Sequence, residues 1–361
     1  MTRLPIRDEL RGLKPYGAPQ LDVPVRLNTN ENPFQPPRDF VEDLAATALD
    51  VARTLNRYPD REAQWLRADL ALYVGAEAET RDIDASMVWV ANGSNEIMTQ
   101  VLQAFGGPGR KALTFSPTYS MYEEYARNTF TEFVSVPRND DFTLDADSAA
   151  GTVRLMKPDV VFLASPNNPT GTAMSLEVVS AVLHAFEGMV VVDEAYAEFR
   201  RPDVPSAVSL LARNPRLIVT RTMSKAFGFA GARVGYAVAD PEVIDALRIV
   251  RLPYHLSSLT QAVARTALAH AGELQEQVRQ LRAERDAIVD WFGANGFVTT
   301  PSDANFVMFG KFADRHAVWQ ALVDHGVLVR EVGPEGYLRV SIGTPSEMEA
   351  FKEALMKVES R

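Results

Sequence analysis

Short apolar runs alternate with helical stretches along the middle of the chain, and this alternation limits the possible folds more than any other feature. The runs lie at residues 87–90, 112–115, 160–164, 189–192, 217–220 and 236–239. Strands that are apolar on both faces are typical of a parallel sheet that helices cover on both sides. The sequence therefore predicts an α/β large domain with a three-layer, mostly parallel sheet.

The segments on either side of this region predict two further parts of the molecule. Residues 1–37 are rich in proline and polar residues and predict an extended N-terminal arm, followed by the large domain over 38–258. Residues 259–361 predict a bridging helix and a small α+β domain. The bridging helix is expected from 259 to about 291, where one long and highly charged helical pattern runs. The strands of the small domain are expected at 305–309, 327–330 and 337–341.

The composition argues against several classes of function. A nucleic-acid surface needs a basic face, and the net charge of this chain is −10. The absence of cysteine excludes disulfides and thiolate metal sites, and the five histidines have no metal-ligand spacing, so no metal is expected. The N-terminus has no apolar signal-peptide core, and no apolar stretch approaches membrane-spanning length. We expect a cytoplasmic protein without a membrane partner.

Polar residues follow the predicted strands, at the sheet edge where ligands of such domains bind. Lys225 follows the strand at 217–220. A lone lysine is most often a surface residue, but this one lies among small and apolar residues, where desolvation beside Arg233 would lower its pKa. Asp193 ends the run at 189–192, where a lone aspartate is most often a cap or turn residue, but Tyr196 follows it.

Other residues could hold an anion or a flat ligand. Gly93, Ser94 and Asn95 open a predicted helix, whose free N–H groups can bind an anion as well as be capped. Arg233 is either a surface ion-pair partner or a clamp for that anion. Tyr119 either fills the core or stacks on a planar ligand.

Two arginines lie in or beside predicted strands of the small domain. Arg339 has apolar neighbours on both sides, so it needs a partner, either an internal acid or the carboxylate of a substrate. Arg330 ends another strand and is a second cation of this kind.

This combination of an amine, a carboxylate, a phenol, an amide and guanidinium groups matches what pyridoxal 5'-phosphate (PLP) requires. Lys225 would hold the cofactor aldehyde as a Schiff base and later move a proton between the substrate Cα and C4′. Asp193 would keep the pyridine nitrogen protonated. Tyr196 and Asn168 would contact the ring oxygen, so Lys225, Asp193 and Tyr196 are the candidate catalytic residues.

The same motifs give the chain a resemblance to a known family over nearly its whole length. It resembles the fold-type-I PLP-dependent aminotransferases, and among them the histidinol-phosphate aminotransferases. The motifs that carry the resemblance are LNTNENP (27–33), RYPD (57–60), NGSNE (92–96), NNPTG (167–171), VDEAY (192–196), SKAFG (224–228) and LRVSIG (338–343).

The resemblance implies a homodimeric enzyme with shared active sites, in which the arm packs on the small domain and on the partner subunit. The implied cofactor-binding residues are Tyr58 (from the neighbouring subunit), Gly93, Ser94, Asn95, Tyr119, Asn168, Asp193, Tyr196, Thr222, Ser224, Lys225 and Arg233. The implied substrate-binding residues are Tyr16, Asn30, Tyr254, Arg330 and Arg339. Arg339 would bind an α-carboxylate, and Arg330 and Tyr16 a phosphate.

The reaction implied by the resemblance converts L-histidinol phosphate and 2-oxoglutarate to imidazole-acetol phosphate and L-glutamate, in histidine biosynthesis. An aromatic amino acid aminotransferase is the close alternative, since it shares the cofactor residues and only Arg330 and Tyr16 separate the two. A PLP-dependent decarboxylase of a phosphorylated amino acid is a further alternative. A catalytically idle PLP-binding regulator is disfavoured, because no basic helix-turn-helix segment is appended.

Overall fold

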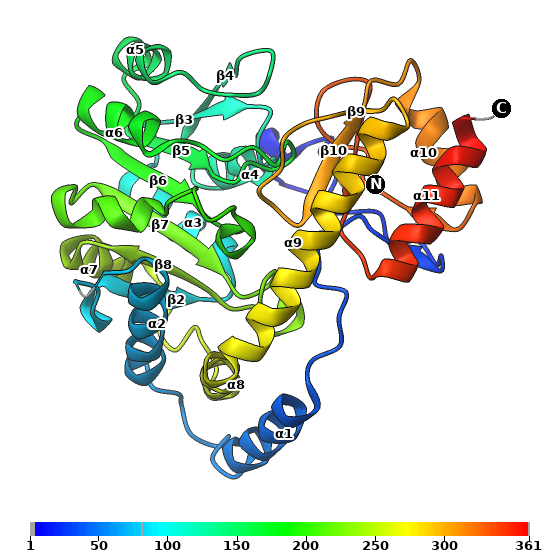
Figure 1. Cartoon of the computed structure of the whole chain (residues 1–361). Helices are drawn as coiled ribbons and strands as arrows, with labels where there is room; N and C mark the ends of the chain where they lie inside the picture. The colour runs from blue at the N-terminus through cyan, green and yellow to red at the C-terminus, as the bar shows by residue number, and fades with distance from the viewer. Residues whose placement is uncertain (1–3, 81, 360–361) are drawn as a thin grey trace.

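The computed structural model describes residues 4–80 and 82–359, and a seven-stranded sheet forms its centre (Figure 1). The strands are β2 Val88–Ala91, β3 Lys111–Ser116, β4 Glu132–Pro137, β5 Val160–Ala164, β6 Met189–Asp193, β7 Leu217–Thr222 and β8 Gly235–Ala239. Their order is β2-β8-β7-β6-β5-β3-β4, and β8 runs in the direction opposite to the other six. The predicted α/β class and mostly parallel sheet are confirmed.

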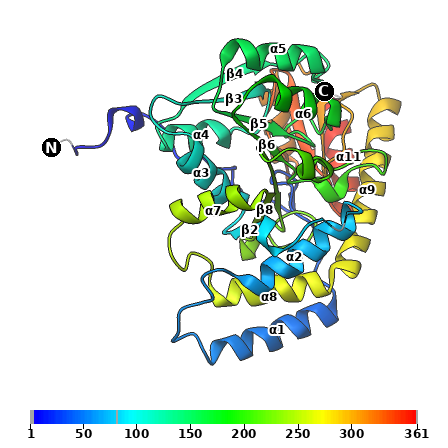
Figure 2. The same ribbon diagram turned by 90° about the vertical axis from the view of Figure 1, so that its left-hand side faces the viewer.

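Helices cover both faces of this sheet, as the fully apolar strands require. They are α2 Gln64–Glu77, α3 Ser94–Phe105, α4 Met121–Asn128, α5 Ala146–Met156, α6 Leu176–Ala185 and α7 Pro241–Val250. Successive strand residues point to opposite faces, so Val190 and Val192 pack with α2, α5 and α6 while Val191 packs with α3, α4 and α7. Figure 2 shows α3, α4 and α7 together on one side of the sheet.

A helical pair lies at the lower end of the large domain in Figure 2, where α1 Arg38–Ala52 packs against α8 Ser258–Ala269. The bridging helix α9 Ala271–Ala294 follows, so the single helix expected from 259 to about 291 is wrong: two helices meet at His270. The His270 ring bonds to Asp43 of α1 at 2.8 Å and to Glu273 at 3.0 Å. Gly272, a weak helix former, lies two residues further on, in the first turn of α9. This contact with α1 fixes the break, and the periodicity of the sequence does not record it.

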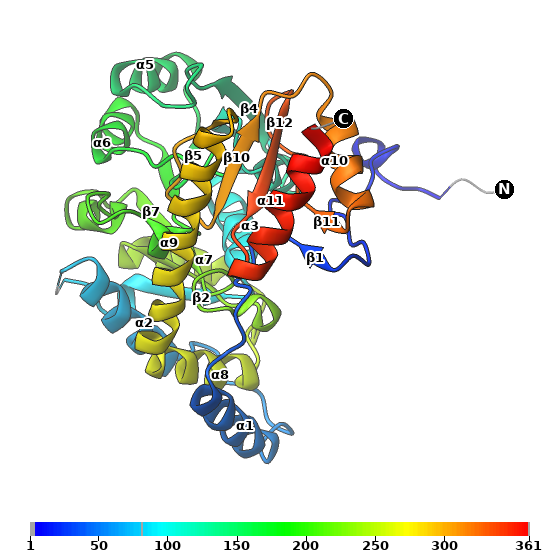
Figure 3. The ribbon, with the colours of Figure 1, turned by 45° about the vertical axis from the view of Figure 1, so that its right-hand side comes forward.

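The small domain contains the antiparallel sheet β12-β10-β9. Its elements are β9 Val298–Thr299, β10 Phe306–Gly310, α10 Arg315–Asp324, β11 Val327–Leu328, β12 Tyr337–Ser341 and α11 Pro345–Glu359. The arm strand β1 Val25–Arg26 pairs in parallel with β11, and Figure 3 shows the two side by side. The boundaries at 37 and 258 stay a prediction.

Short 3-10 helices complete the described secondary structure: Asp8–Leu10, Ala85–Met87, Ala197–Phe199, Ala207–Arg213 and Ala230–Ala232. Over residues 4–80 and 82–359, none of the helices combines the length and the apolar character needed to cross a membrane.

Candidate active site

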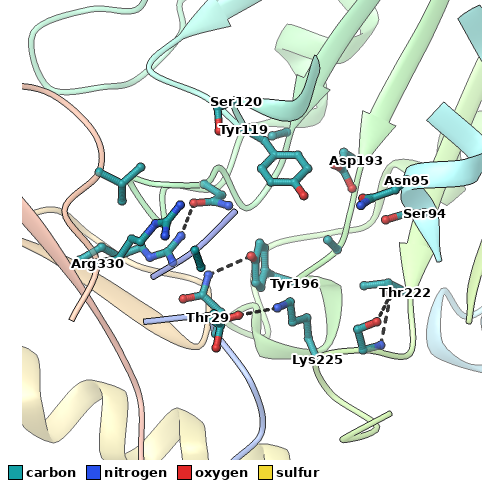
Figure 4. A pocket seen from close by; sticks show the side chains of 18 of the residues that line it. Thr29, Ser94, Asn95, Tyr119, Ser120, Asp193, Tyr196, Thr222, Lys225 and Arg330 are labelled. Atoms are coloured by element: carbon teal, nitrogen blue, oxygen red, sulfur yellow. Dashed lines mark hydrogen bonds between the residues drawn. The ribbon is translucent and has the colours of Figure 1, made fainter. Parts of the chain in front are cut away.

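A cavity of about 290 Å³ lies where the carboxyl ends of the parallel strands meet the arm and the small domain (Figure 4). This is the edge at which open α/β sheets bind ligands, and the volume is near the lower end for a small-molecule site. The cavity is lined by every predicted site residue except Tyr58, Gly93 and Tyr254. The structure thus brings together residues from the arm, five strand ends and the small domain.

Lys225 lies in the loop after β7, with its ammonium group at the cavity wall. Its Nζ donates a hydrogen bond to the backbone carbonyl of Thr29 in the arm, at 2.8 Å. Burial, together with the nearby cations of Arg339 and Arg233, lowers the pKa of Lys225 to about 8, although Glu31 opposes this shift. A lysine whose pKa is lowered in this way is a nucleophile near neutral pH.

The lowered pKa predicts how fast the cofactor-free protein captures an aldehyde. We expect the capture rate to rise with pH through a midpoint near 8, because only the neutral amine attacks. About a tenth of Lys225 is then neutral at pH 7, against roughly one part in 3000 at the ordinary pKa of 10.5. Stopped-flow absorbance with pyridoxal, which has no phosphate to titrate, measures the midpoint. A midpoint near 10 would contradict the effect of burial.

Asp193 ends β6 and approaches the cavity from a different side than Lys225 (Figure 4). Tyr122 of α4 donates to Asp193 Oδ2 at 2.8 Å, and Thr220 of β7 donates to Oδ1 at 3.3 Å. Burial raises the pKa of Asp193 to about 6, and these two hydrogen bonds oppose the rise. Tyr122 and Thr220 were not predicted from the sequence, since neither lies in a recognisable motif.

Replacing Tyr122 by phenylalanine tests its influence on Asp193. Loss of a donor to a carboxylate raises the carboxyl pKa, and such a bond contributes about 1.5–3 kcal/mol, or roughly one to two pH units. We therefore expect the acid limb of the pH profile of kcat/KM to move up by about that amount. Thr220→Val is the graded control, because its bond to Asp193 is longer. Equal shifts in the two variants would speak against a special role of Tyr122.

The other end of the cavity is a cradle for an anion. Ser94 and Asn95 at the start of α3, Thr222 at the end of β7, and Ser224 and Arg233 line it. Arg233 donates to Ser224 Oγ at 3.2 Å. Among the described residues, no carboxylate forms an ion pair with Arg233, so the structure does not support a surface ion pair.

Glycine is required at two positions of this cradle. A Cβ at Gly93, whose φ is +81°, would lie 2.6 Å from Arg233 Nη2, so glycine lets the guanidinium approach the start of α3. A Cβ at Gly235 would lie 2.1 Å from the backbone nitrogen of Ser94. Gly93 therefore supports the cradle, although it does not line the cavity itself.

Three polar or aromatic side chains form the walls between the two ends. Tyr119 packs edge-on against Tyr122, at a ring-centre distance of 5.6 Å. The Tyr196 hydroxyl accepts a hydrogen bond from Asn30 Nδ2 at 2.9 Å, and Asn168 Oδ1 accepts one from Arg339 at 2.5 Å. Tyr122 packs behind Tyr119, and the other five of these side chains line the cavity.

Arg339 is a buried cation without an acidic partner among the described residues. It donates to Asn168 Oδ1 and, at 2.9 Å, to the backbone carbonyl of Asn28, while its Nε has no hydrogen-bond partner. Burial lowers the pKa of Arg339 to about 10. Arg330 is paired with Arg339 through two backbone hydrogen bonds of 2.9 Å, and its side chain makes one long contact, 3.4 Å, to Gly17. Of the two partners foreseen for Arg339, an internal acid and a ligand, the described structure provides no internal acid.

Tyr58 and Tyr254 lie outside the cavity of their own chain. Their rings stack on each other at 4.5 Å, and they are 81% and 42% exposed. Tyr254 turns toward Tyr58 with a left-handed backbone, φ 56°, and its expected substrate contact stays a prediction. Tyr58 was expected to act only on a neighbouring subunit.

The residues of the cavity fit PLP. A half-buried lysine with a lowered pKa can join an aldehyde, a buried carboxylate can pair with a pyridinium, and the cradle around Arg233 offers an uncompensated cation to a phosphate. Together with the mostly parallel sheet and the small domain, these features define a PLP-dependent aminotransferase.

Comparison with known proteins gives the family. Residues 23–355 match the family model of aminotransferase class I and II. The histidinol-phosphate aminotransferase of Thermobifida fusca (strain YX) is 60% identical over 99% of this chain and 96% of that protein. The histidinol-phosphate aminotransferase of Corynebacterium glutamicum (strain ATCC 13032) is 51% identical over 99% of this chain and 97% of that protein. The chain belongs to the histidinol-phosphate aminotransferase family.

A solved structure agrees with this assignment. The crystal structure of histidinol-phosphate aminotransferase from Sinorhizobium meliloti in complex with pyridoxal-5'-phosphate matches this chain with a TM-score of 0.81 at 26% sequence identity. The match covers 93% of this chain and 91% of that one. The predicted fold type and cofactor are thereby confirmed.

Proposed function

We propose that this chain transfers the amino group of L-histidinol phosphate to 2-oxoglutarate, giving imidazole-acetol phosphate and L-glutamate. The observation that carries the proposal is the pair of guanidinium groups, Arg339 and Arg330, on the wall formed by the small domain. The cradle around Arg233 serves the cofactor phosphate, so this second pair is available for an anion on the substrate. The named activity of close relatives supports the same substrate.

Arg339 and Arg330 would bind the anionic groups of the two substrates. L-Histidinol phosphate has a phosphate monoester and no carboxylate, whereas glutamate presents an α-carboxylate. Arg339, buried and without an acid, suits either anion. Among the described residues, the Arg330 guanidinium hydrogen-bonds only to the Gly17 carbonyl, at 3.4 Å, so it can turn toward the larger charge of a phosphate, with Tyr16 also lining the cavity.

The cofactor residues take the roles expected from their surroundings. When bound, PLP supplies an aldehyde that an amine can join and a pyridinium ring that accepts electron density. Lys225 would hold the aldehyde, Asp193 the ring nitrogen, and Arg233 with its neighbours the phosphate. Neutral Lys225 would also be the base that moves a proton at the substrate Cα.

A homodimer with shared sites is part of this proposal. Tyr58 and Tyr254 stack on each other at the surface, and exposed apolar side chains lie nearby in sequence at Trp65 and Leu252. A partner subunit would cover these side chains and could place Tyr58 against the phosphate cradle of the other chain. Sedimentation at micromolar concentration tests for the dimer.

Replacing Arg330 by glutamine tests the substrate. A cation removed from a phosphate contact costs about 2 kcal/mol or more, so kcat/KM for L-histidinol phosphate should fall about 30-fold or further. The value for phenylalanine should change little, because phenylalanine has no second anion. Arg26→Gln on strand β1 removes the same charge from an exposed position outside the cavity and serves as the control.

Half-reaction rates of the unaltered protein distinguish between the two candidate substrates. We expect half-reaction rates with L-histidinol phosphate to exceed those with phenylalanine and leucine. If phenylalanine reacts equally well, the aromatic amino acid aminotransferase is the better description. Release of carbon dioxide without a keto-acid product would instead indicate a decarboxylase.

A further inference from the structure

Asn30, in the N-terminal arm, is fixed by hydrogen bonds on all sides. Its backbone N–H donates to Ser341 Oγ at 2.8 Å, and its backbone carbonyl accepts from Asn305 Nδ2 at 3.0 Å. The Ser341 hydroxyl in turn donates to Asn30 Oδ1 at 2.9 Å. The backbone of Asn30 is left-handed, with φ 54°, a conformation that asparagine tolerates better than most residues. Both the place and the orientation of its amide are therefore set.

The Ser341 hydroxyl decides which way this amide faces. Ser341 Oγ accepts the Asn30 backbone N–H, so its single proton is left for the amide oxygen of Asn30. The NH₂ group must then point away from Ser341, and it donates to the Tyr196 hydroxyl at 2.9 Å. Tyr196 is thus an acceptor on the side of the arm, and its own proton has to point elsewhere.

The Tyr196 hydroxyl lies at the cavity, beside Lys225 (Figure 4). The residue is only 6% exposed, and its ring is held edge-on against Phe306 at 5.0 Å. Within residues 4–80 and 82–359, no protein group other than Asn30 hydrogen-bonds to this hydroxyl. A buried phenol whose proton has no protein acceptor is oriented to donate to a bound ligand.

We propose that Asn30 is a positioning residue that turns Tyr196 into a hydrogen-bond donor toward the ring oxygen of bound PLP. Ser341 lies two residues after Arg339 in β12, on the same face of the strand. The strand that presents Arg339 to the substrate therefore also sets the direction of the Tyr196 proton, through Asn30. This role is additional to the substrate contact expected for Asn30, which lines the cavity, and it rests on the proposed contact between Tyr196 and the cofactor.

The substitution Asn30→Asp reverses the hydrogen bond between the two residues. A carboxylate can only accept, so Tyr196 would donate its proton to the arm and withdraw it from the cofactor. A ring oxygen without this donor is more basic and keeps the proton that it shares with the lysine nitrogen up to higher pH. The pH midpoint of the absorbance change of PLP-loaded protein should rise by about one unit, the size of one hydrogen bond to a charged oxygen.

A double-mutant cycle separates this effect from that of the added charge. The midpoint is measured in the unaltered protein, in Asn30→Asp, in Tyr196→Phe and in the double variant. We expect Asn30→Asp to raise the midpoint about one unit more when the Tyr196 hydroxyl is present than when it is absent. None of the charged or titratable side chains that face Tyr196 and Lys225 is altered, namely Arg339, Arg233, Asp193, Glu31, Tyr16 and Tyr119.

Two further variants keep the test decisive. Asn32→Asp adds the same charge two residues along the arm, where the side chain contacts Gln277 at 3.1 Å and does not line the cavity, so it should show the charge effect alone. Asn30→Gly suits a positive φ, adds no charge and should give a smaller rise that also depends on Tyr196, should the aspartate variant fail to fold.

The outcomes separate the role of Asn30 from the contact between Tyr196 and the cofactor. Equal rises with and without the Tyr196 hydroxyl, or equal rises from Asn32→Asp and Asn30→Asp, would overturn the role of Asn30. A Tyr196→Phe protein with an unchanged midpoint would instead overturn the proposed contact between Tyr196 and the cofactor.

Discussion

Replacing Lys225 by alanine is expected to abolish transamination while leaving weak binding of PLP. The substitution removes both the amine that would hold the cofactor and the base that would move the substrate proton, so the rate should fall by at least about 10⁴-fold. The phosphate cradle at Arg233 and the carboxylate of Asp193 remain, and they should still bind the cofactor without a covalent bond. Single-turnover absorbance with glutamate measures the loss.

A matched lysine provides the control for this experiment. Lys111 begins β3, at the opposite end of the strand from the cavity, and its Nζ contacts the backbone carbonyl of Met156. Lys111→Ala should therefore keep the activity of the unaltered protein. Borohydride reduction of the loaded protein, followed by digestion, should place a pyridoxyl group on the peptide that contains Lys225. A tag on another lysine, or measurable turnover by Lys225→Ala, would refute the assignment.

Replacing Asp193 by asparagine is expected to have the second largest effect, a fall in kcat of about 10²–10³-fold. This is the size seen when one electrostatic group aimed at a developing charge is removed. A neutral amide cannot hold a proton on the pyridine nitrogen, so the ring would accept electron density poorly. The hydrogen bond that Tyr122 donates to Asp193 at 2.8 Å favours the charged form of this carboxylate.

Chemical rescue distinguishes this electronic role from a structural one. An N-methylated cofactor carries a permanent positive charge on its ring nitrogen and needs no acid beside it. In Asp193→Ala, which leaves room for the methyl group, this analogue should restore much of the single-turnover rate that PLP itself cannot support. If the analogue is no better than PLP in that variant, Asp193 acts mainly by holding the site together.

The fold was predictable from the sequence wherever burial leaves a pattern. Strands such as β5 and β6 are buried on both faces and stand out as apolar runs. The edge strand β4 was not predicted, because it contains no continuous apolar run. Its residues are all exposed or half-buried. The break between α8 and α9 was also missed, since helical periodicity continues across His270 and the contact that fixes the break comes from Asp43 in α1.

The residues of the candidate site were likewise predictable only where they belong to a local sequence motif. Lys225, Asp193 and Arg233 lie in short local motifs, so the sequence could indicate them. The groups that orient them come from distant segments: Lys225 bonds to the Thr29 carbonyl 196 residues away, and Tyr122 bonds to Asp193 71 residues away. A backbone carbonyl has no residue signature, and one tyrosine among ten in the chain gives no signal of its own.

The pairing of β1 with β11 sets an order of events during synthesis. Val25 aligns with Val327, 302 positions later, so the arm has no strand to join until the ribosome has nearly finished the chain. At roughly 5–20 residues per second, this delay lasts about 15–60 s. The nascent large domain can build its sheet in that time, but the wall formed by Thr29 and Asn30 has to be added afterwards. A newly made chain is therefore expected to form the arm side of its active site only after β11 has been synthesised.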